Sequence, residues 1–127
     1  MTGQQLFDLS VGRMGISPSN ATSYSDTIIT QINGVLAETF TLENNVREYK
    51  ALAVLTTIPQ ITLLSETLTY QDDVLKNVVS WALCQQLAVS DSEFALANYF
   101  GDKYEAGKRM TKKLIATEIV DFASGEE

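Results

Sequence analysis

Residues 69–93 read TYQDDVLKNVVSWALCQQLAVSDSE, the most continuously apolar helical pattern in the chain. Its hydrophobic side chains fall on so many sides of an ideal helix that little polar surface remains, so we expect a central helix covered by other elements. Thr69 begins a Thr-x-x-Asp capping box, and Asp72 and Asp73 would then lie in the first turn, where the helix dipole favours anions. Trp81 is expected to be a core or interface anchor.

The sequence that follows predicts a second long helix. Ser90 and Glu93 form a Ser-x-x-Glu capping box. Apolar or small residues then recur at a spacing of three or four, which is typical of one buried helix face. This predicted face comprises Ala97, Phe100, Tyr104, Gly107, Thr111, Leu114, Ile115 and Phe122.

The same helix carries a basic arc and an aromatic cluster. The arc is open to three interpretations: a solvated face, a contact for an acidic protein surface, or a nucleic-acid patch. The aromatic cluster is expected to belong either to the core or to an interface. The arc consists of Lys108, Arg109, Lys112 and Lys113, and the cluster consists of Phe94, Tyr99, Phe100 and Tyr104.

Two further helices are predicted in the first half of the chain. The first covers residues 4–14 and ends at Gly15, which suits the position after a helix C-terminus. Residues 17–25 have a linker composition. The second helix is expected to begin near Ser23, in a Ser-x-x-Asp capping box, and to reach about Asn45, where two asparagines weaken the helical preference.

The middle of the chain has a different texture. Between residues 49 and 68 many side chains are β-branched, which favours extended backbone over helix, and Pro59 interrupts the run. We expect two short extended segments, at about 51–57 and 60–64, that form either a β-hairpin or a long loop. The predicted fold class is therefore mainly α, with a bundle of about four helices and an extended connection between the second and third.

Composition limits the class of protein. The chain has 127 residues, of which 45% are hydrophobic and 20% charged, and we expect residues 1–127 to form a single globular domain. A net charge of −7 argues against a dedicated nucleic-acid binder. No secretion signal or membrane span is predicted. The single cysteine, Cys84, is expected to be a small buried hydrophobic residue.

The residues that most enzymes use are missing from the sequence. There is no histidine, which removes Ser-His-Asp and Cys-His catalysis and histidine-containing zinc sites. No glycine-rich loop resembles a nucleotide-binding motif. The sixteen acids could in principle supply paired carboxylates, but most lie at predicted helix caps or polar faces. We therefore expect no catalytic residues, no cofactor and no metal site.

Three stretches resemble the head-tail connector family of tailed phages, the adaptor proteins that ring the portal. In the first, Leu68-Thr69-Tyr70 leads into an apolar helix that ends in the acidic turn 89–93. The second, residues 94–105, resembles the family's run of a small residue, Asn, two aromatics and Tyr-Glu. The third is Ile119-Val120-Asp121-Phe122, where the family often has tyrosine at the position of Phe122. The order and length of the predicted elements also match across nearly the whole chain.

This resemblance implies a structural virion protein in the phage neck, made in the host bacterial cytoplasm. Typically twelve copies of such a protein form a ring below the portal protein. The C-terminal segment would reach toward the portal and the extended segment toward a stopper or tail protein. DNA would pass through the channel without specific binding, and we hypothesise that acidic channel walls help it to slide because they repel phosphate.

The interface candidates lie in the C-terminal segment, in the extended segment 51–64 and in the basic arc. They are Ile119, Phe122, Val54, Ile58, Ile61, Leu63, Lys108 and Lys112. Two alternative functions stay open at the level of sequence. One is a stopper or tail-completion protein of the same neck, and the other is a bacterial helical regulator or antitoxin-like binding protein.

Overall fold

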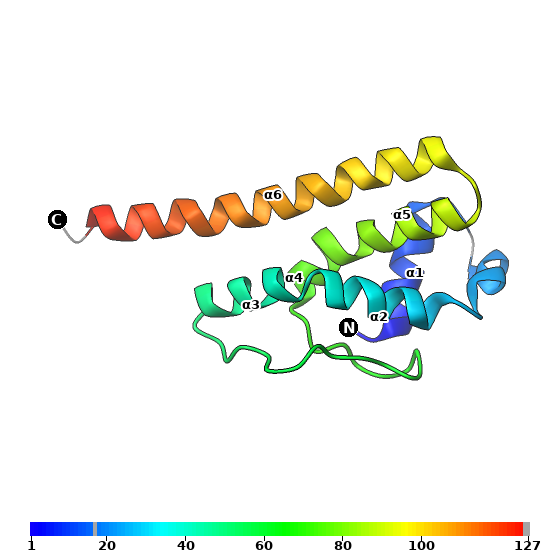
Figure 1. The fold of residues 1–127 in the computed structure, drawn as a ribbon, viewed down its shortest axis with the longest axis horizontal. Coiled ribbons are helices and arrows are strands. Elements are labelled where there is room, and N and C mark those ends of the chain that lie inside the picture. The colour runs from blue at the N-terminus through cyan, green and yellow to red at the C-terminus, as the bar shows by residue number, and fades with distance from the viewer. Residues whose placement is uncertain (17, 126–127) are drawn as a thin grey trace.

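The computed structural model describes residues 1–16 and 18–125, and for residues 18–20 and 117–125 it describes the backbone only. The fold is mainly helical, as predicted, and the described residues contain no β-strand (Figure 1). The elements are α1 (Gly3–Arg13), the 3-10 helix η1 (Pro18–Tyr24), α2 (Ile28–Glu38), α3 (Phe40–Tyr49), α4 (Asp72–Val74), the π-helical turn η2 (Leu75–Val79), α5 (Ser80–Ser90) and α6 (Phe94–Gly125).

The central helix predicted from residues 69–93 is present. The elements α4, η2 and α5 follow one another without a break, and this composite helix contacts α1, α2 and α6. Its apolar residues are almost wholly buried, which explains why the sequence shows so little polar surface there. They include Val74, Leu75, Val78, Val79, Leu83 and Leu87.

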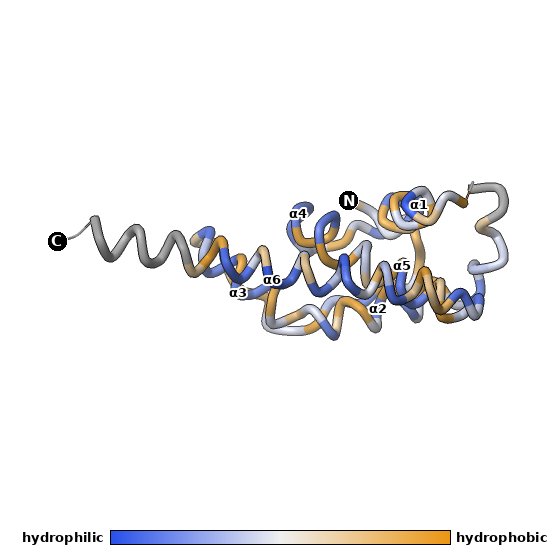
Figure 2. Tube along the Cα trace, turned by 90° about the horizontal axis from the view of Figure 1, so that it is seen from above, coloured by the Kyte–Doolittle hydropathy of each residue, from blue (hydrophilic) through white to orange (hydrophobic). Residues whose placement is uncertain are grey.

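The core joins this helix to the first half of the chain. Hydrophobic and hydrophilic residues alternate along the helices (Figure 2), and many of the hydrophobic ones are buried. The largest fully buried side chains outside the central helix are Leu6, Val11, Ile28, Ile32, Val35 and Leu36. A smaller cluster of Cys84, Ala88, Ala97 and Phe100 lies between α5 and α6. Cys84 is fully buried, as the sequence predicted.

The long C-terminal helix pairs with α5 in an α-hairpin. It starts beside the end of α5, runs back over it and continues past α3 (Figure 1). The connecting turn includes Ser92 in a left-handed conformation with φ of 59°. The predicted capping box does not form, because the Ser90 hydroxyl donates to the Gln86 carbonyl oxygen at 3.0 Å within α5.

The second predicted helix differs most from expectation. It begins at Ile28 instead of Ser23, and the supposed linker from Pro18 forms a 3-10 helix. Tyr24 explains the difference, because its ring packs edge-on against Phe7 and its hydroxyl donates to the Asp91 carboxylate. These contacts over long sequence separations fix the segment before α2 in a tighter conformation.

The same predicted helix is also divided in two. Thr39 separates α2 from α3, and its buried hydroxyl donates to the Val35 carbonyl oxygen at 2.7 Å. A threonine that bonds back to the preceding turn competes with the regular helix hydrogen bonds and often bends a helix. The bend carries α3 toward α6, which it contacts.

The π-helical turn η2 is where α1 and the central helix are tied together. The Ser80 N–H bonds to the Leu75 carbonyl oxygen, five residues back, so the Lys76 carbonyl oxygen loses its usual helical donor. That oxygen instead accepts from the Ser80 hydroxyl and from the Arg13 guanidinium, both at 2.6 Å. Arg13 also lies 4.2 Å above the centre of the Trp81 ring.

The helix α6 crosses η2 very closely at Gly107. A Cβ atom at this position would lie 2.2 Å from the Asn77 carbonyl oxygen, so only glycine fits without backbone movement. The glycine that the sequence placed on the buried face of this helix is therefore the point of closest approach between α6 and the central helix.

Candidate interaction surfaces

Most of the large hydrophobic side chains that are exposed among the described residues lie in two regions of the molecule. One is the segment 51–71, which connects α3 to α4 and which we call the loop. The other is α6. The exposed hydrophobic residues of these regions are Leu52, Val54, Ile58 and Leu63 in the loop and Phe94, Leu96, Tyr99, Met110 and Leu114 in α6.

The first part of the loop, residues 51–61, is called here its outward limb. Two asparagines hold it. The Asn44 amide donates to the Leu55 carbonyl oxygen at 3.0 Å and accepts from the Leu55 N–H at 2.8 Å. The Asn33 amide makes the same pair of bonds with Ile61, each of 2.9 Å. Each side chain thus replaces a neighbouring strand for one residue of the loop, which explains how extended backbone is satisfied without a hairpin.

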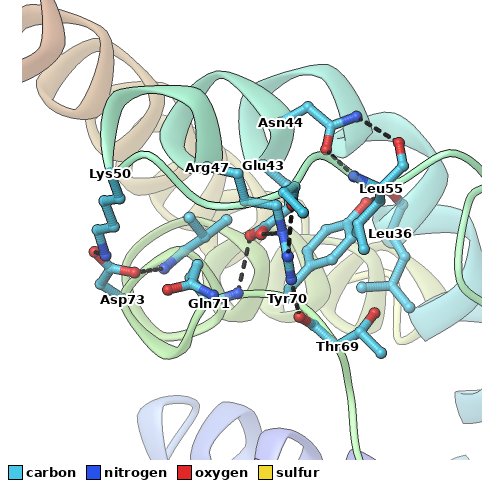
Figure 3. A network of polar contacts seen from close by, with 12 residues as sticks. Leu36, Glu43, Asn44, Arg47, Lys50, Leu55, Thr69, Tyr70, Gln71 and Asp73 are labelled. Carbon is cyan, nitrogen blue, oxygen red and sulfur yellow. Dashed lines mark hydrogen bonds and ion pairs between the residues drawn. The ribbon is translucent and has the colours of Figure 1, made fainter.

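A buried ion pair joins the two limbs of the loop (Figure 3). The Arg47 Nε donates to the Glu43 carboxylate at 2.6 Å, and the same guanidinium donates to the carbonyl oxygens of Ala53 and Thr69. The other oxygen of Glu43 accepts from the Gln71 N–H at 3.0 Å. The pair therefore fixes both the beginning and the end of the loop against α3.

This network replaces the predicted capping box at Thr69. The residue at the start of α4 is Gln71, and no side chain of its own caps the helix. Its N–H is instead satisfied by Glu43 of α3. Tyr70 is buried beside it and its hydroxyl donates to the Leu36 carbonyl oxygen (Figure 3). Asp72 and Asp73 lie in the first turn, as predicted.

Burial sets the electrostatics of the ion pair. The Glu43 side chain is fully buried, and its burial raises the pKa of the carboxyl above the ordinary value of 4.5. The hydrogen bonds from the Gln71 N–H and from Arg47 act in the opposite direction but are smaller effects. A buried carboxylate of this kind depends on its partners, because it has no water to replace them.

The second part of the loop, residues 62–71, is its return limb. The N-terminal segment holds it. The Gln4 N–H bonds to the Leu64 carbonyl oxygen at 2.8 Å, and the Leu68 N–H bonds to the Met1 carbonyl oxygen at 2.8 Å. Where the two limbs meet, the Glu66 carboxylate accepts from the N–H groups of Thr62 and Leu63, both at 2.6 Å. These bonds lower the pKa of Glu66. The loop is thus hydrogen-bonded on both of its limbs.

The structure separates the interface candidates of the loop into two groups. Val54 and Ile58 are each 43% exposed, and Leu63 is 62% exposed. Ile61 is only 5% exposed, and its side chain packs close to Gly3. The interface candidate Ile61 is therefore buried in this conformation, and the bonds from Asn33 hold its backbone there. Leu52, which sequence analysis did not single out, is 42% exposed.

The helix α6 has two apolar seams. The inner seam, formed by Ala97, Phe100, Tyr104 and Gly107, packs on the rest of the molecule. The outer seam consists of Leu96, Tyr99, Lys103, Ala106, Met110 and Leu114, again at a spacing of three or four. The periodicity of α6 predicts that Leu114 is buried, but its side chain is 63% exposed. The aromatic cluster is likewise divided, because Phe100 and Tyr104 are buried while Phe94 and Tyr99 are exposed.

The basic arc lies beside these seams. Lys108 is half-buried, with its ammonium 4.3 Å from the centre of the Tyr104 ring and 2.9 Å from the Glu105 carboxylate. Lys112 is exposed, as are Arg109 and Lys113. The two remaining interface candidates, Ile119 and Phe122, lie on the α6 backbone, but their side chains fall outside the described part of the structure.

Three other groups are buried or hydrogen-bonded in ways that limit their reactivity. Burial raises the pKa of the Cys84 thiol to about 12, which leaves almost no reactive thiolate at neutral pH. Burial is also the main reason that the pKa of the Tyr24 phenol rises to about 12. The Tyr104 hydroxyl bonds to the Glu38 carboxylate at 3.2 Å in a shallow polar groove between α2, α5 and α6.

Metal, membrane and family comparisons add no further site. Among the side chains that the structure describes, no group of three or more His, Cys, Asp or Glu is placed to hold a metal ion. Within the described part of the chain, no helix has the length and apolar character needed to cross a bilayer. A functional proposal therefore rests on the loop and on the outer seam of α6. No family model, curated protein or solved structure matches this chain.

Proposed function

We propose that this chain is a structural virion protein of a tailed phage, an adaptor subunit that forms a ring between the portal and the stopper or tail. The ring, typically of twelve copies, would let DNA pass through its centre. In this proposal the chain has no enzymatic activity and acts by binding the portal protein, neighbouring copies of itself and the next neck component.

The observation that carries this proposal is the pre-ordered loop. A segment of 21 residues without regular structure usually costs entropy when it binds a partner. Here the loop is already held by Asn33, Asn44 and Arg47, so the exposed Val54, Ile58 and Leu63 can meet a partner at little ordering cost. Such an arrangement is typical of a docking element.

The position of α6 supplies the second surface that a ring subunit needs. A subunit that joins the portal to the next neck component requires two different binding surfaces. The loop and the distal part of α6 are separate elements with different composition, since the loop is apolar and α6 is basic beyond residue 106. The resemblance to the connector family favours contact of the C-terminal segment with the portal and contact of the loop with the stopper.

Charge supports the passage of DNA through such a ring. Residues 1–100 carry ten acids and four bases, a sum of −6, while residues 101–127 carry six acids and five bases, a sum of −1. Acidic walls repel phosphate, so the body of the subunit is suited to a channel lining through which DNA slides. The basic arc would then face protein instead of DNA.

The direct test is to mix the chain with the portal protein encoded in the same genome and to image the product by electron microscopy. We expect a ring of density below the portal. A variant that lacks residues 119–127 should keep its helical circular dichroism and lose portal binding. A Val54→Asp and Ile58→Asp double variant should still bind the portal.

Two outcomes would contradict this proposal, and a third would relocate its portal contact. A chain that never binds the portal but recognises a preassembled adaptor ring would be a stopper or tail-completion protein. A chain that binds neither and regulates a bacterial target would belong to the third class. Unchanged portal binding after the deletion would move the portal contact away from the end of α6.

A further inference from the structure

Among the described residues, the outer seam of α6 is a helix-packing surface that the rest of the molecule leaves largely uncovered. Its six positions advance by three, four, three, four and four residues, which keeps them on one side of a helix for five turns. Leu96, Tyr99, Met110 and Leu114 are 43%, 52%, 65% and 63% exposed. The two central positions, Lys103 and Ala106, are compatible with close helix approach, because Ala106 is small and the Lys103 ammonium folds over the Tyr99 ring at 5.5 Å.

The charge along α6 is strongly polarised. Residues 94–105 contain two acids and one base, whereas residues 106–116 contain four bases and no acid. On the outer flank of the seam this polarity appears as Asp102 in the first part and as Arg109 and Lys113 in the second. All three side chains are exposed.

We propose that the outer seam binds the outer seam of a second copy of this chain, with the two α6 helices antiparallel. A two-fold axis near Glu105 places Leu96 of one copy opposite Leu114 of the other. The same register places Tyr99 opposite Met110 and Lys103 opposite Ala106. Every apolar position of the seam then meets an apolar or small position, as an isologous contact requires.

Charge selects the antiparallel direction and the identity of the partner. The antiparallel register brings Asp102 of each copy beside Arg109 of the other, which gives two symmetric ion pairs at the rim of the seam. A parallel pair would instead place the four cations of residues 106–116 beside the same four cations of the other helix. A second copy therefore complements both the apolar pattern and the charge of α6.

This two-fold pairing joins free chains and is distinct from the contact between neighbours in the proposed ring. It does not depend on the portal, so it can be tested on the purified chain alone. Because a single helix seam buries less surface than a standard interface, we expect association at roughly 10–100 µM. Sedimentation equilibrium should then give a mass that rises from 14.0 kDa toward twice this value with concentration. Met110→Asp should reduce the association constant at least roughly tenfold, because it places a charge in the middle of the seam.

A matched control is Phe94→Asp, which removes a side chain of similar exposure on the other side of the same helix. This variant should associate like the wild type. Asp102→Arg should weaken pairing by placing like charges together, and the double change Asp102→Arg with Arg109→Asp should restore it. Restoration is the result that a merely destabilised helix would not give.

Cysteine cross-linking distinguishes the two directions, in a Cys84→Ala background. A mixture of the Leu96→Cys and Leu114→Cys variants should form a mixed disulfide. Each variant alone should not, because positions 96 of the two antiparallel helices lie about 27 Å apart. Cross-linking of Leu96→Cys with itself would overturn the antiparallel model, and a mass of 14.0 kDa at all concentrations would overturn the pairing itself. A monomeric chain that still binds the portal would refute the pairing and leave the proposed function intact.

Discussion

The loop and α6 both expose apolar side chains, but they are held in opposite ways. The loop has no regular structure, and polar side chains such as Asn33, Asn44 and Arg47 hold its backbone. The backbone of α6 satisfies its own hydrogen bonds, and the helix is held to the body by close packing at its inner seam. The loop should therefore respond to the loss of a polar group, and α6 to a change of volume.

The difference explains how a small body can carry a long irregular segment. Loops of more than about 15 residues without regular structure are uncommon in compact proteins, because unpaired backbone groups are costly away from water. Side chains from α2, α3 and the loop itself take the place of strand neighbours here. Loss of the pair formed by Glu43 and Arg47 should cost the most stability, since water cannot replace either partner at these buried side chains.

The largest effect is expected at the loop anchor. Glu43→Ala leaves Arg47 half-buried without its carboxylate and leaves the Gln71 N–H without its acceptor. Breaking a buried ion pair in this way costs about 3–5 kcal/mol of unfolding free energy, which urea titration followed by circular dichroism would measure. Glu48→Ala, an exposed change on the same helix, is the matched control and should stay within about 0.5 kcal/mol. Equal stability of the two variants would refute the role given to Glu43.

The second effect breaks α6 instead of the loop. Gly107→Ala introduces a Cβ that overlaps the Asn77 carbonyl oxygen, and such overpacking costs about 1–3 kcal/mol. Gly34→Ala in α2, where no atom lies within 4 Å of the new Cβ, should instead stabilise the protein by about 0.5–1 kcal/mol. Thermal unfolding of both variants measures the contrast. If the two substitutions shift Tm in the same direction, the close crossing at Gly107 is not real.

A smaller effect separates one asparagine from its neighbour. Asn44→Ala removes both hydrogen bonds to Leu55. Because Leu55 is only half-buried, the unfolding free energy should fall by only about 1 kcal/mol. Hydrogen exchange at the Leu55 amide should accelerate, while exchange in α6 should not change. Asn45→Ala, one position further along and exposed, should leave the Leu55 amide protected. Unchanged protection of the Leu55 amide in the Asn44→Ala variant would show that the Asn44 side chain is not needed to hold Leu55.

The smallest expected effect is a dependence on pH. Because burial raises the pKa of Glu43 above 4.5, the folded protein holds this proton more tightly than the unfolded chain does. The contribution of Glu43 to stability is therefore complete below pH 4.5 and declines as pH rises through its raised pKa. As pH rises from 4.5 through the raised pKa, the unfolding free energy of the wild type should therefore fall relative to that of Glu43→Gln. A shift in the other direction would mean that the hydrogen bonds to Glu43 outweigh its burial.

The sequence predicts those parts of the fold that depend on local periodicity. The covered central helix, the long last helix and the buried Cys84 all follow from the spacing of apolar residues. The starts of three helices do not, because the polar side chains near Ser23, Thr69 and Ser90 make other contacts. Tyr24 is held by Asp91, and the N–H of Gln71 by Glu43, over separations that no local pattern encodes.

The loop and the seams of α6 show the same limit. Asn33 and Asn44 are eleven residues apart, about three helical turns, so their position on one face was a signal available in the sequence. Their partners, 28 and 11 residues away, were not. The outer seam could not be predicted for a different reason. A periodic pattern identifies an apolar stripe on a helix, but it does not tell which of two adjacent stripes the rest of the molecule covers.

The most direct test of the whole account is a reconstruction of the chain assembled on its portal at a resolution that places side chains. We expect Val54, Ile58 and Leu63 to lie on the side away from the portal, in the conformation set by Asn33 and Asn44, and the end of α6 to contact the portal. An assembly in which the loop has left its anchors, or in which α6 touches no other subunit, would contradict the account.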